Sequence, residues 1–217
     1  MLDPIRLVAL ISGGGTTLQN LIDQIAAGKL PATIAGVVAS RADAFGVTRA
    51  ERAGLPVSVV PKGNSANKSE SGHPPPSRAG FAENVWAAVR AFNPQLVCFA
   101  GWLHLLPIPE DFRQRVLNIH PSLLPAFGGK GMYGHHVHEA VLNYGAKVTG
   151  CTVHFADDTY DTGPILVQKC VPVKAGDDPD TLAARVFQAE CEAYPEAIRL
   201  IAEGKATVQG RRVVITD

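Results

Sequence analysis

The chain has 217 residues, a length that suits one medium-sized domain with a substantial core. Hydrophobic residues make up 46% and charged residues 18%, and no apolar run approaches the roughly 20 residues of a membrane span. The formal net charge is zero, so no electrostatic attraction favours nucleic acid or an anionic membrane, and a small-molecule partner is the better expectation.

The first hundred residues alternate apolar runs with helical patterns, an order typical of a parallel sheet with crossover helices. Strands are predicted at 5–11, 34–39, 57–60 and 96–100, and helices at 18–27, 43–53 and 81–92. The segment 62–77 interrupts this pattern with Ser, Asn, Gly and three successive prolines, which predicts a mobile surface loop.

The remaining residues follow a different pattern. A strand at 116–119 is followed by a Pro/Gly-rich stretch and a short helix at 135–143, then by two long strands at 147–155 and 165–173 that we expect to be antiparallel. A long helix is predicted at 179–202, capped by Asp177 or Asp178, and 211–215 as a terminal strand. The fold class is α/β: a Rossmann-like, mostly parallel sheet flanked by helices, with a mixed C-terminal half.

A glycine-rich loop, Ser12–Thr17, lies between the first strand and the first helix. Three glycines let the backbone approach an anion, and the helix start offers free N–H groups and the positive end of the helix dipole. The loop has neither the G-x-G-x-x-G spacing of a dinucleotide site nor the lysine of a P-loop. It therefore favours a single phosphate, with a tight structural turn as the alternative.

Asn118 and His120 stand two residues apart at the end of a predicted parallel strand, so they point to the same face. Ligands of open α/β sheets bind at this edge. An amide N–H can stabilise an oxyanion and an imidazole can transfer a proton, while Asp161 in the loop 157–163 is the best candidate to orient the histidine. The alternative is that both side chains only satisfy backbone groups at the strand end.

The four cysteines, Cys98, Cys151, Cys170 and Cys191, are widely spaced. We expect buried free thiols in a reducing cytoplasm, because no signal peptide is visible and no C-x-x-C pair occurs. His135, His136 and His138 could suggest a metal site, but the surface start of a helix is the preferred interpretation, and we expect no metal.

The sequence resembles the folate-dependent formyltransferases over nearly its whole length, and most closely the single-domain branch that formylates glycinamide ribonucleotide in purine biosynthesis. The resemblance depends on LISGGGTTLQNLID at 10–23, SRADAFG at 40–46, NIHPSLLP at 118–125 and GCTVHFADDTYDTGPILVQ at 150–168, with Glu190 before Tyr194 and Pro195. It implies one domain, 1–217, with a phosphate-binding half at 1–100 and a catalytic and folate-binding half at 101–217.

The resemblance also implies roles for individual residues. The amine of 5′-phosphoribosylglycinamide would attack the formyl carbon of the co-substrate 10-formyltetrahydrofolate. Asn118 and a protonated His120 would stabilise the oxyanion, and Asp161 would orient His120, raise its pKa and relay protons, with His154 supporting the site from behind. The remaining implied positions are Gly14, Gly15, Thr16 and Thr17 for the phosphate, Glu190 for the ribose, and Leu103, His104, Leu106, Val116, Ala156, Asp157, Asp158, Thr159 and Tyr160 for the folate.

Some positions depart from the family pattern: Gly14 and Thr17 where Asn is common, His104 where Arg is common, and Phe187 where a polar residue is common. The alternatives are formyltetrahydrofolate hydrolase, for whose regulatory domain we expect no room before Ile5, and other folate-dependent formyltransferases acting on transfer RNA or sugar nucleotides. A binding module without chemistry would leave the Asn-His-Asp set unexplained. We expect a cytoplasmic monomer or homodimer with small-molecule substrates, no nucleic acid and no membrane.

Overall fold

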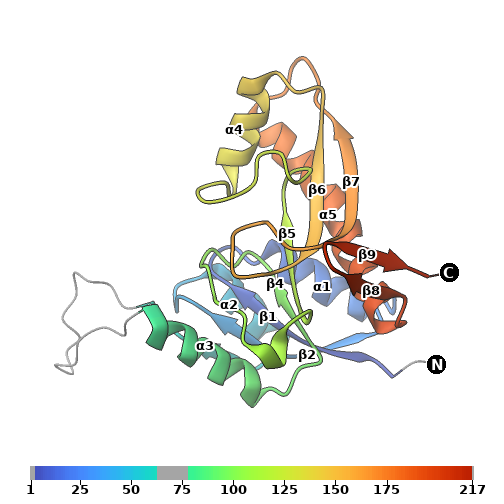
Figure 1. The fold of residues 1–217 in the computed structure, drawn as a ribbon. Helices are drawn as coiled ribbons and strands as arrows, with labels where there is room; N and C mark the ends of the chain where they lie inside the picture. The colour runs from blue at the N-terminus through green and yellow to red at the C-terminus, as the bar shows by residue number, and fades with distance from the viewer. Residues whose placement is uncertain (1–2, 63–77, 217) are drawn as a thin grey trace.

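The computed structural model describes residues 3–62 and 78–216, and its centre is a seven-stranded sheet in the order β3-β2-β1-β4-β5-β6-β7 (Figure 1). The strands are β1 (Ile5–Ile11), β2 (Ala32–Ala39), β3 (Val57–Val59), β4 (Leu96–Phe99), β5 (Val116–His120), β6 (Val148–Phe155) and β7 (Ile165–Pro172). The first five strands pair in parallel, and β6 and β7 join them as antiparallel neighbours. The predicted α/β class with a mixed C-terminal half is confirmed.

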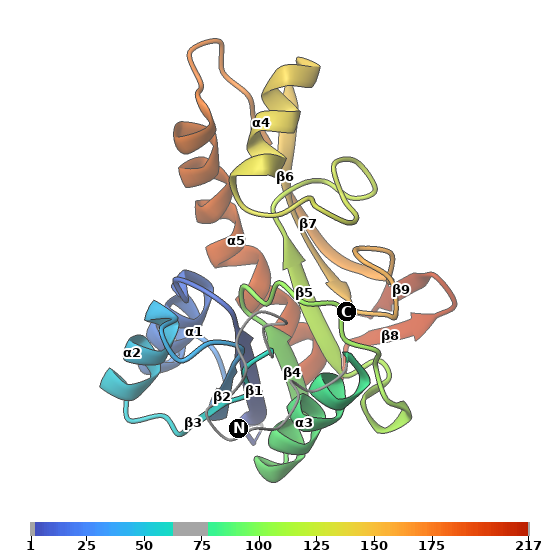
Figure 2. The same ribbon diagram turned by 90° about the vertical axis from the view of Figure 1, so that its left-hand side faces the viewer.

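Helices cover both faces of the sheet, as the two views in Figures 1 and 2 show. They are α1 (Thr16–Ala26), α2 (Phe45–Arg52), α3 (Arg78–Ala91), α4 (His135–Tyr144) and α5 (Pro179–Ala202), with a short 3-10 turn at Glu110–Phe112. Successive residues of β1 alternate between faces: Leu7 packs with α1 and α5, whereas Val8 packs with α3. This two-sided burial explains why β1 is apolar without interruption from Leu7 to Ile11.

The long helix α5 begins and packs for identifiable reasons. Asp178 is its N-cap and forms a reciprocal capping box with Thr181, which decides between the two predicted caps. Pro195 lies inside the helix and has no N–H to bond to the carbonyl oxygen of Cys191 four residues earlier. That oxygen instead accepts a hydrogen bond from Asn20 Nδ2 of α1 at 3.1 Å, so the proline helps to join α5 to α1.

Three expectations need correction or lie outside the structure. A separate hairpin of β8 (Ala206–Gln209) and β9 (Arg212–Ile215) ends the described chain, and β8 is a short, half-exposed strand that was not predicted. Cys98 and Cys151 are buried, but Cys170 is exposed because it points outward from the edge strand β7. The predicted mobile loop falls almost entirely on 63–77, outside the described residues. No helix within the described ranges is long and apolar enough to cross a membrane.

Candidate active site

A cavity of about 600 Å³ opens where the parallel strands end. The chain leaves β1 toward β2 on one side, and β4 and β5 lie on the other, so β1 and β4 form the point at which strand order reverses. Ligands of doubly wound sheets bind at this point. The cavity is lined by residues that follow β1 and β4, by the end of β5, by the loop after β6, and by one side each of α4 and α5.

The glycine-rich loop leads from β1 into α1 and lies at one end of this cavity. Gly15 is the N-cap of α1 in a left-handed conformation (φ 69°), and no side chain caps the helix start. A Cβ atom on Gly15 would lie 2.5 Å from the Cα atom of Gly46, so α2 approaches the loop too closely for any other residue. Thr16 and Thr17 line the cavity, and Gly14 and Gly15 form the turn beneath them. The open N–H groups of the first turn suit an anion.

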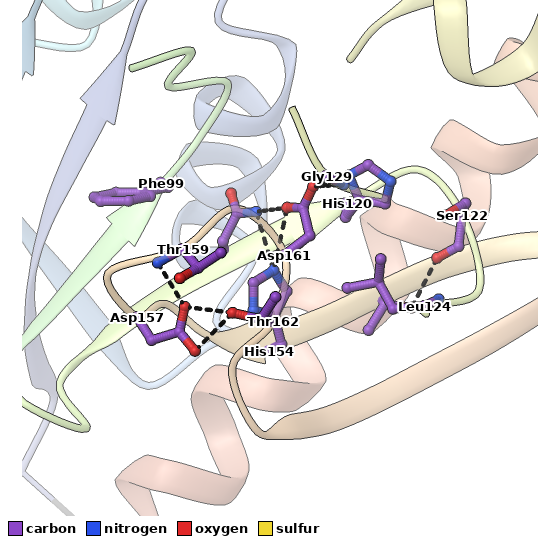
Figure 3. A network of polar contacts seen from close by, with 12 residues as sticks. Phe99, His120, Ser122, Leu124, Gly129, His154, Asp157, Thr159, Asp161 and Thr162 are labelled. Carbon is purple, nitrogen blue, oxygen red and sulfur yellow. Dashed lines mark hydrogen bonds and ion pairs between the residues drawn. The ribbon is translucent and has the colours of Figure 1, made fainter. Parts of the chain in front are cut away.

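Asn118, His120 and Asp161 all line the cavity, and Figure 3 shows His120 and Asp161 side by side. Asn118 and His120 end β5, and Asp161 returns to them from the loop between β6 and β7. The Asp161 carboxylate lies 3.3 Å from Asn118 Nδ2 and 3.5 Å from His120 Nδ1. Asp161 Oδ2 also accepts a hydrogen bond from the Gly129 N–H at 2.9 Å. The structure therefore brings two of the predicted residues, Asn118 and His120, to the carboxylate of the third, Asp161.

His154 supports this cluster from β6, where it is the direct cross-strand neighbour of Asn118. Its Nδ1 lies 3.0 Å from the carbonyl oxygen of Phe155, which can only accept, so Nδ1 carries the proton. Nε2 is then an acceptor and lies 3.1 Å from Asn118 Nδ2. Because Asp161 is also an acceptor, the Asn118 amide is oriented with its nitrogen toward both residues.

The environment of His120 differs from the one expected. Its Nε2 lies 2.8 Å from the carbonyl oxygen of Phe127, so this nitrogen carries the proton of the neutral ring. Burial lowers the pKa of His120 and outweighs the opposite effect of Asp161. Asp161 thus acts on the pKa of His120 in the expected direction, but burial makes the net shift in the free protein downward, which disfavours the protonated His120 that the resemblance implies. Burial also raises the pKa of Asp161, but its contacts with His154, His120 and the Gly129 N–H bring the net direction below the usual value.

An apolar slot adjoins this cluster between segment 101–108 and the loop 156–161. Two hydrogen bonds join the segments: Leu105 N–H donates to Tyr160 Oη at 3.1 Å and Ile108 N–H to Asp158 Oδ1 at 2.8 Å. Of the residues predicted to line a folate slot, those that line the cavity are Leu103, His104, Leu106, Ala156, Asp157, Thr159 and Tyr160.

Two predicted slot residues have other positions. Val116 is 1% exposed and packs in the core beneath α3, because it begins β5 and the cavity opens at the other end of that strand. Asp158 turns away to accept from Ile108 and lies near Arg113. The prediction missed several residues that do line the cavity: Phe99, Trp102, Leu105, Met132 and Tyr133. Trp102 and Leu105 lie in the mostly apolar stretch after Gly101, and that stretch could have indicated them.

Glu190 and Phe187 line the cavity from α5, one helical turn apart. Glu190 is half-buried, and burial raises the pKa of its carboxyl to about 7. No cation beside it contributes to the shift among the described residues. A ligand that donates hydrogen bonds to this carboxylate would stabilise its charged form.

The three histidines of α4 do not share one environment. His135 and His136 are exposed, whereas His138 is 4% exposed and lines the cavity, so its predicted place on the surface is wrong. Within residues 3–62 and 78–216, no group of three or more His, Cys, Asp or Glu side chains is placed to hold a metal ion.

Comparison with known proteins agrees with this geometry. Residues 5–198 match the family model described as formyl transferase. The phosphoribosylglycinamide formyltransferase of Escherichia coli (strain K12) is 35% identical over 92% of this chain and 88% of its own length. The crystal structure of glycinamide ribonucleotide transformylase 1 from Symbiobacterium toebii is 41% identical, with a TM-score of 0.87, and covers 99% of this chain and 95% of that one.

The chain also matches one part of larger proteins. It is 38% identical, over 94% of its length, to the trifunctional purine biosynthetic protein adenosine-3 of Gallus gallus, of which it spans 19%. The family match covers most of the described residues, including β1, the Asn-His pair, Asp161 and Glu190. The chain therefore belongs to the formyl transferase family, and within it to the group of the phosphoribosylglycinamide formyltransferases.

Proposed function

We propose that the protein transfers the formyl group of 10-formyltetrahydrofolate to the amine of 5′-phosphoribosylglycinamide. The observation that carries the proposal is that a single cavity adjoins an anion-type loop, a buried carboxylate, an Asn-His-Asp cluster and an apolar slot. These are the four kinds of group that a phosphorylated ribose with an amine and a folate would together require. The names of the relatives favour formyl transfer to the same ribonucleotide.

In this proposal the ribonucleotide lies along α1 and α5. The backbone of Gly14 and Gly15 and the hydroxyls of Thr16 and Thr17 bind the phosphate, where the open first turn of α1 favours an anion. Glu190 accepts hydrogen bonds from the ribose hydroxyls, which offset the cost of burying its charge. The amine then points toward Asn118 and His120.

The folate would occupy the slot formed by Leu103, His104 and Leu106, closed by Ala156–Tyr160. The slot is already held open by the hydrogen bonds of Tyr160 and Asp158 to segment 101–108, so the donor meets a preformed surface. The formyl carbon would lie where the slot meets the cluster, within reach of the amine.

Transfer then takes two steps: the amine attacks the formyl carbon, and the resulting tetrahedral intermediate collapses. The amine nitrogen forms a bond to the formyl carbon, and the carbonyl electrons move to its oxygen. The Asn118 N–H that points to Asp161 at 3.3 Å in the free protein turns to this oxygen and stabilises its charge. His120 is neutral before the reaction and can receive the proton that the amine loses, and Asp161, 3.5 Å from its Nδ1, stabilises the resulting imidazolium. Collapse re-forms the carbonyl and breaks the bond to the folate nitrogen, which takes up the proton held by His120 and leaves the imidazole neutral again.

The main alternative is hydrolysis of the same donor, with water in place of the amine. Hydrolysis gives no use to the anion-type loop or to Glu190. The test is a spectrophotometric assay with 10-formyl-5,8-dideazafolate. We expect the deformylated folate to appear only when the ribonucleotide is present, whereas equal release without it would establish a hydrolase. Absence of release in both mixtures would point to another formyl acceptor or donor.

A further inference from the structure

His138 is a buried polar side chain that the proposed chemistry leaves unused. It lies in the first turn of α4, is 4% exposed, and lines the same cavity as His120 and Glu190. Its neighbour His136 is exposed and faces Glu139, so burial is a property of this position and not of the helix. A core role alone does not explain an imidazole that borders a cavity.

Nδ1 of His138 has no hydrogen-bond partner in the part of the chain that the structure describes. An unpaired buried polar atom destabilises the folded protein, and each instance calls for an explanation. Burial, and then His135 and His120, lower the pKa of His138 to about 4, so the ring is neutral near pH 7. Since orphaned N–H groups are rarer than orphaned lone pairs, the proton belongs on Nε2, which makes Nε2–H the donor that the ring can offer to the cavity.

The surroundings of His138 associate it with one side of the cavity. α4 packs on α5, and His135 Nε2 lies 3.4 Å from Asp180 Oδ1, which joins the starts of the two helices. Ala183, Phe187 and Glu190 line the cavity from α5 on this side. The apolar slot is formed by other segments, 101–108 and 156–161. His138 therefore belongs to the wall that carries Glu190, and it lines the same cavity as His120.

We propose that His138 binds the glycinamide arm of the acceptor substrate, with Nε2–H donating to the amide carbonyl oxygen. This inference rests on the proposed function. The arm connects a ribose held at Glu190 to an amine held at His120, and its carbonyl oxygen loses water when it enters the cavity. A neutral donor on this wall would replace that water, restrict rotation of the arm and aim the amine at the formyl carbon.

The test compares three probes against three variants by calorimetry. The probes are glycinamide ribonucleotide, ribose 5-phosphate, which lacks the arm, and 10-formyl-5,8-dideazafolate. The variants are His138→Phe, His138→Gln, which keeps a donor, and the control His136→Phe on the exposed side of α4. We expect His138→Phe to raise the Kd of the ribonucleotide by about 3–10-fold, the effect of one hydrogen bond, and to leave the other two probes unchanged. His138→Gln should recover part of the loss, and His136→Phe should change nothing.

Each other pattern would overturn the inference. An equal loss for ribose 5-phosphate would mean that the arm is not the contact, and a loss for the dideazafolate alone would place the ring in the donor slot. An unchanged ribonucleotide Kd in His138→Phe would show that His138 makes no contact with the ribonucleotide. Wild-type protein that binds no ribonucleotide would instead contradict the proposed function and, with it, this contact.

Discussion

The two walls of the cavity differ in how their polar groups are satisfied. On the slot wall, Tyr160 accepts from Leu105 N–H and Asp158 from Ile108 N–H, so the protein pairs these groups itself. On the helical wall, Nδ1 of His138 has no partner within the described ranges, and no cation there contributes to the pKa of the half-buried Glu190.

The slot wall is therefore stabilised by hydrogen bonds within the protein, whereas the helical wall has polar groups that a ligand could pair with. Internal hydrogen bonds on the slot wall stabilise a shape, which suits a flat, largely apolar ring system. Unsatisfied groups on the helical wall cost stability in the free protein, and a polar ligand that pairs with them recovers that cost. The account therefore predicts that changes on the helical wall act on ribonucleotide binding, and changes on the slot wall on donor binding.

The largest effect is expected at Asp161, where the two walls meet. Asp161→Asn removes the charge beside His120, and turnover should fall by about 10²–10⁴-fold, the usual contribution of a proton-transfer group. The fold should persist, as circular dichroism and Tm would show. Asp43→Asn, which changes an exposed carboxylate paired with Arg41, is the matched control. Turnover of Asp161→Asn at the wild-type rate would refute the assignment of the cluster.

The substitution Glu190→Ala should mainly weaken binding of the ribonucleotide. Hydrogen bonds to a charged group contribute about 1.5–3 kcal/mol, so the KM for this substrate should rise by roughly 10–100-fold. The KM for the donor should stay within twofold. Glu192→Ala, on the exposed side of the same helix, is the control. A rise confined to the donor KM would mean that Glu190 does not bind the ribose.

Tyr160→Phe tests the slot wall. The substitution removes the oxygen that accepts from Leu105 N–H, at a cost of about 0.5–1.5 kcal/mol to the shape of the slot. We expect the donor KM to rise by roughly 2–10-fold without a change in the ribonucleotide KM. Tyr144→Phe, at an exposed tyrosine, should have no effect on either. A change in the ribonucleotide KM alone would show that the walls are not specialised in this way.

The smallest effect concerns stability and pH. The folded protein raises the pKa of Glu190 from 4.5 to about 7, so ionisation of this group opposes folding increasingly as pH rises between those values. Glu190→Gln removes that opposition. The Tm of the variant should be close to that of the wild type at pH 4.5 and higher by a few degrees at pH 8, as measured by calorimetry without substrates. A difference that is greatest at low pH would contradict the cause given for the shift.

Much of the fold follows from local signals. The sequence predicts β1 with the bounds Ile5–Ile11 because burial on both faces produces a strand that is apolar except at Arg6. It predicts α5 at Pro179–Ala202 because a capping residue and a proline mark its start. β8 was missed because its short, half-exposed sequence carries no such pattern.

The site was harder to predict because it depends on tertiary packing. The return of Asp161 to β5 requires the β6–β7 pairing, and the contact of His154 with Asn118 depends on cross-strand register. The burial of His138 and the turning of Asp158 away from the slot are set by elements distant in sequence, which no local pattern reports.

The central claim is that one cavity brings a formyl donor and a ribonucleotide amine together for direct transfer. The most direct test is to mix the protein with a donor carrying a ¹³C-labelled formyl group and with glycinamide ribonucleotide, and to follow the label by NMR. We expect the label to appear in a new amide on the ribonucleotide, with little free formate. Labelled formate at the same rate with or without the ribonucleotide would contradict it.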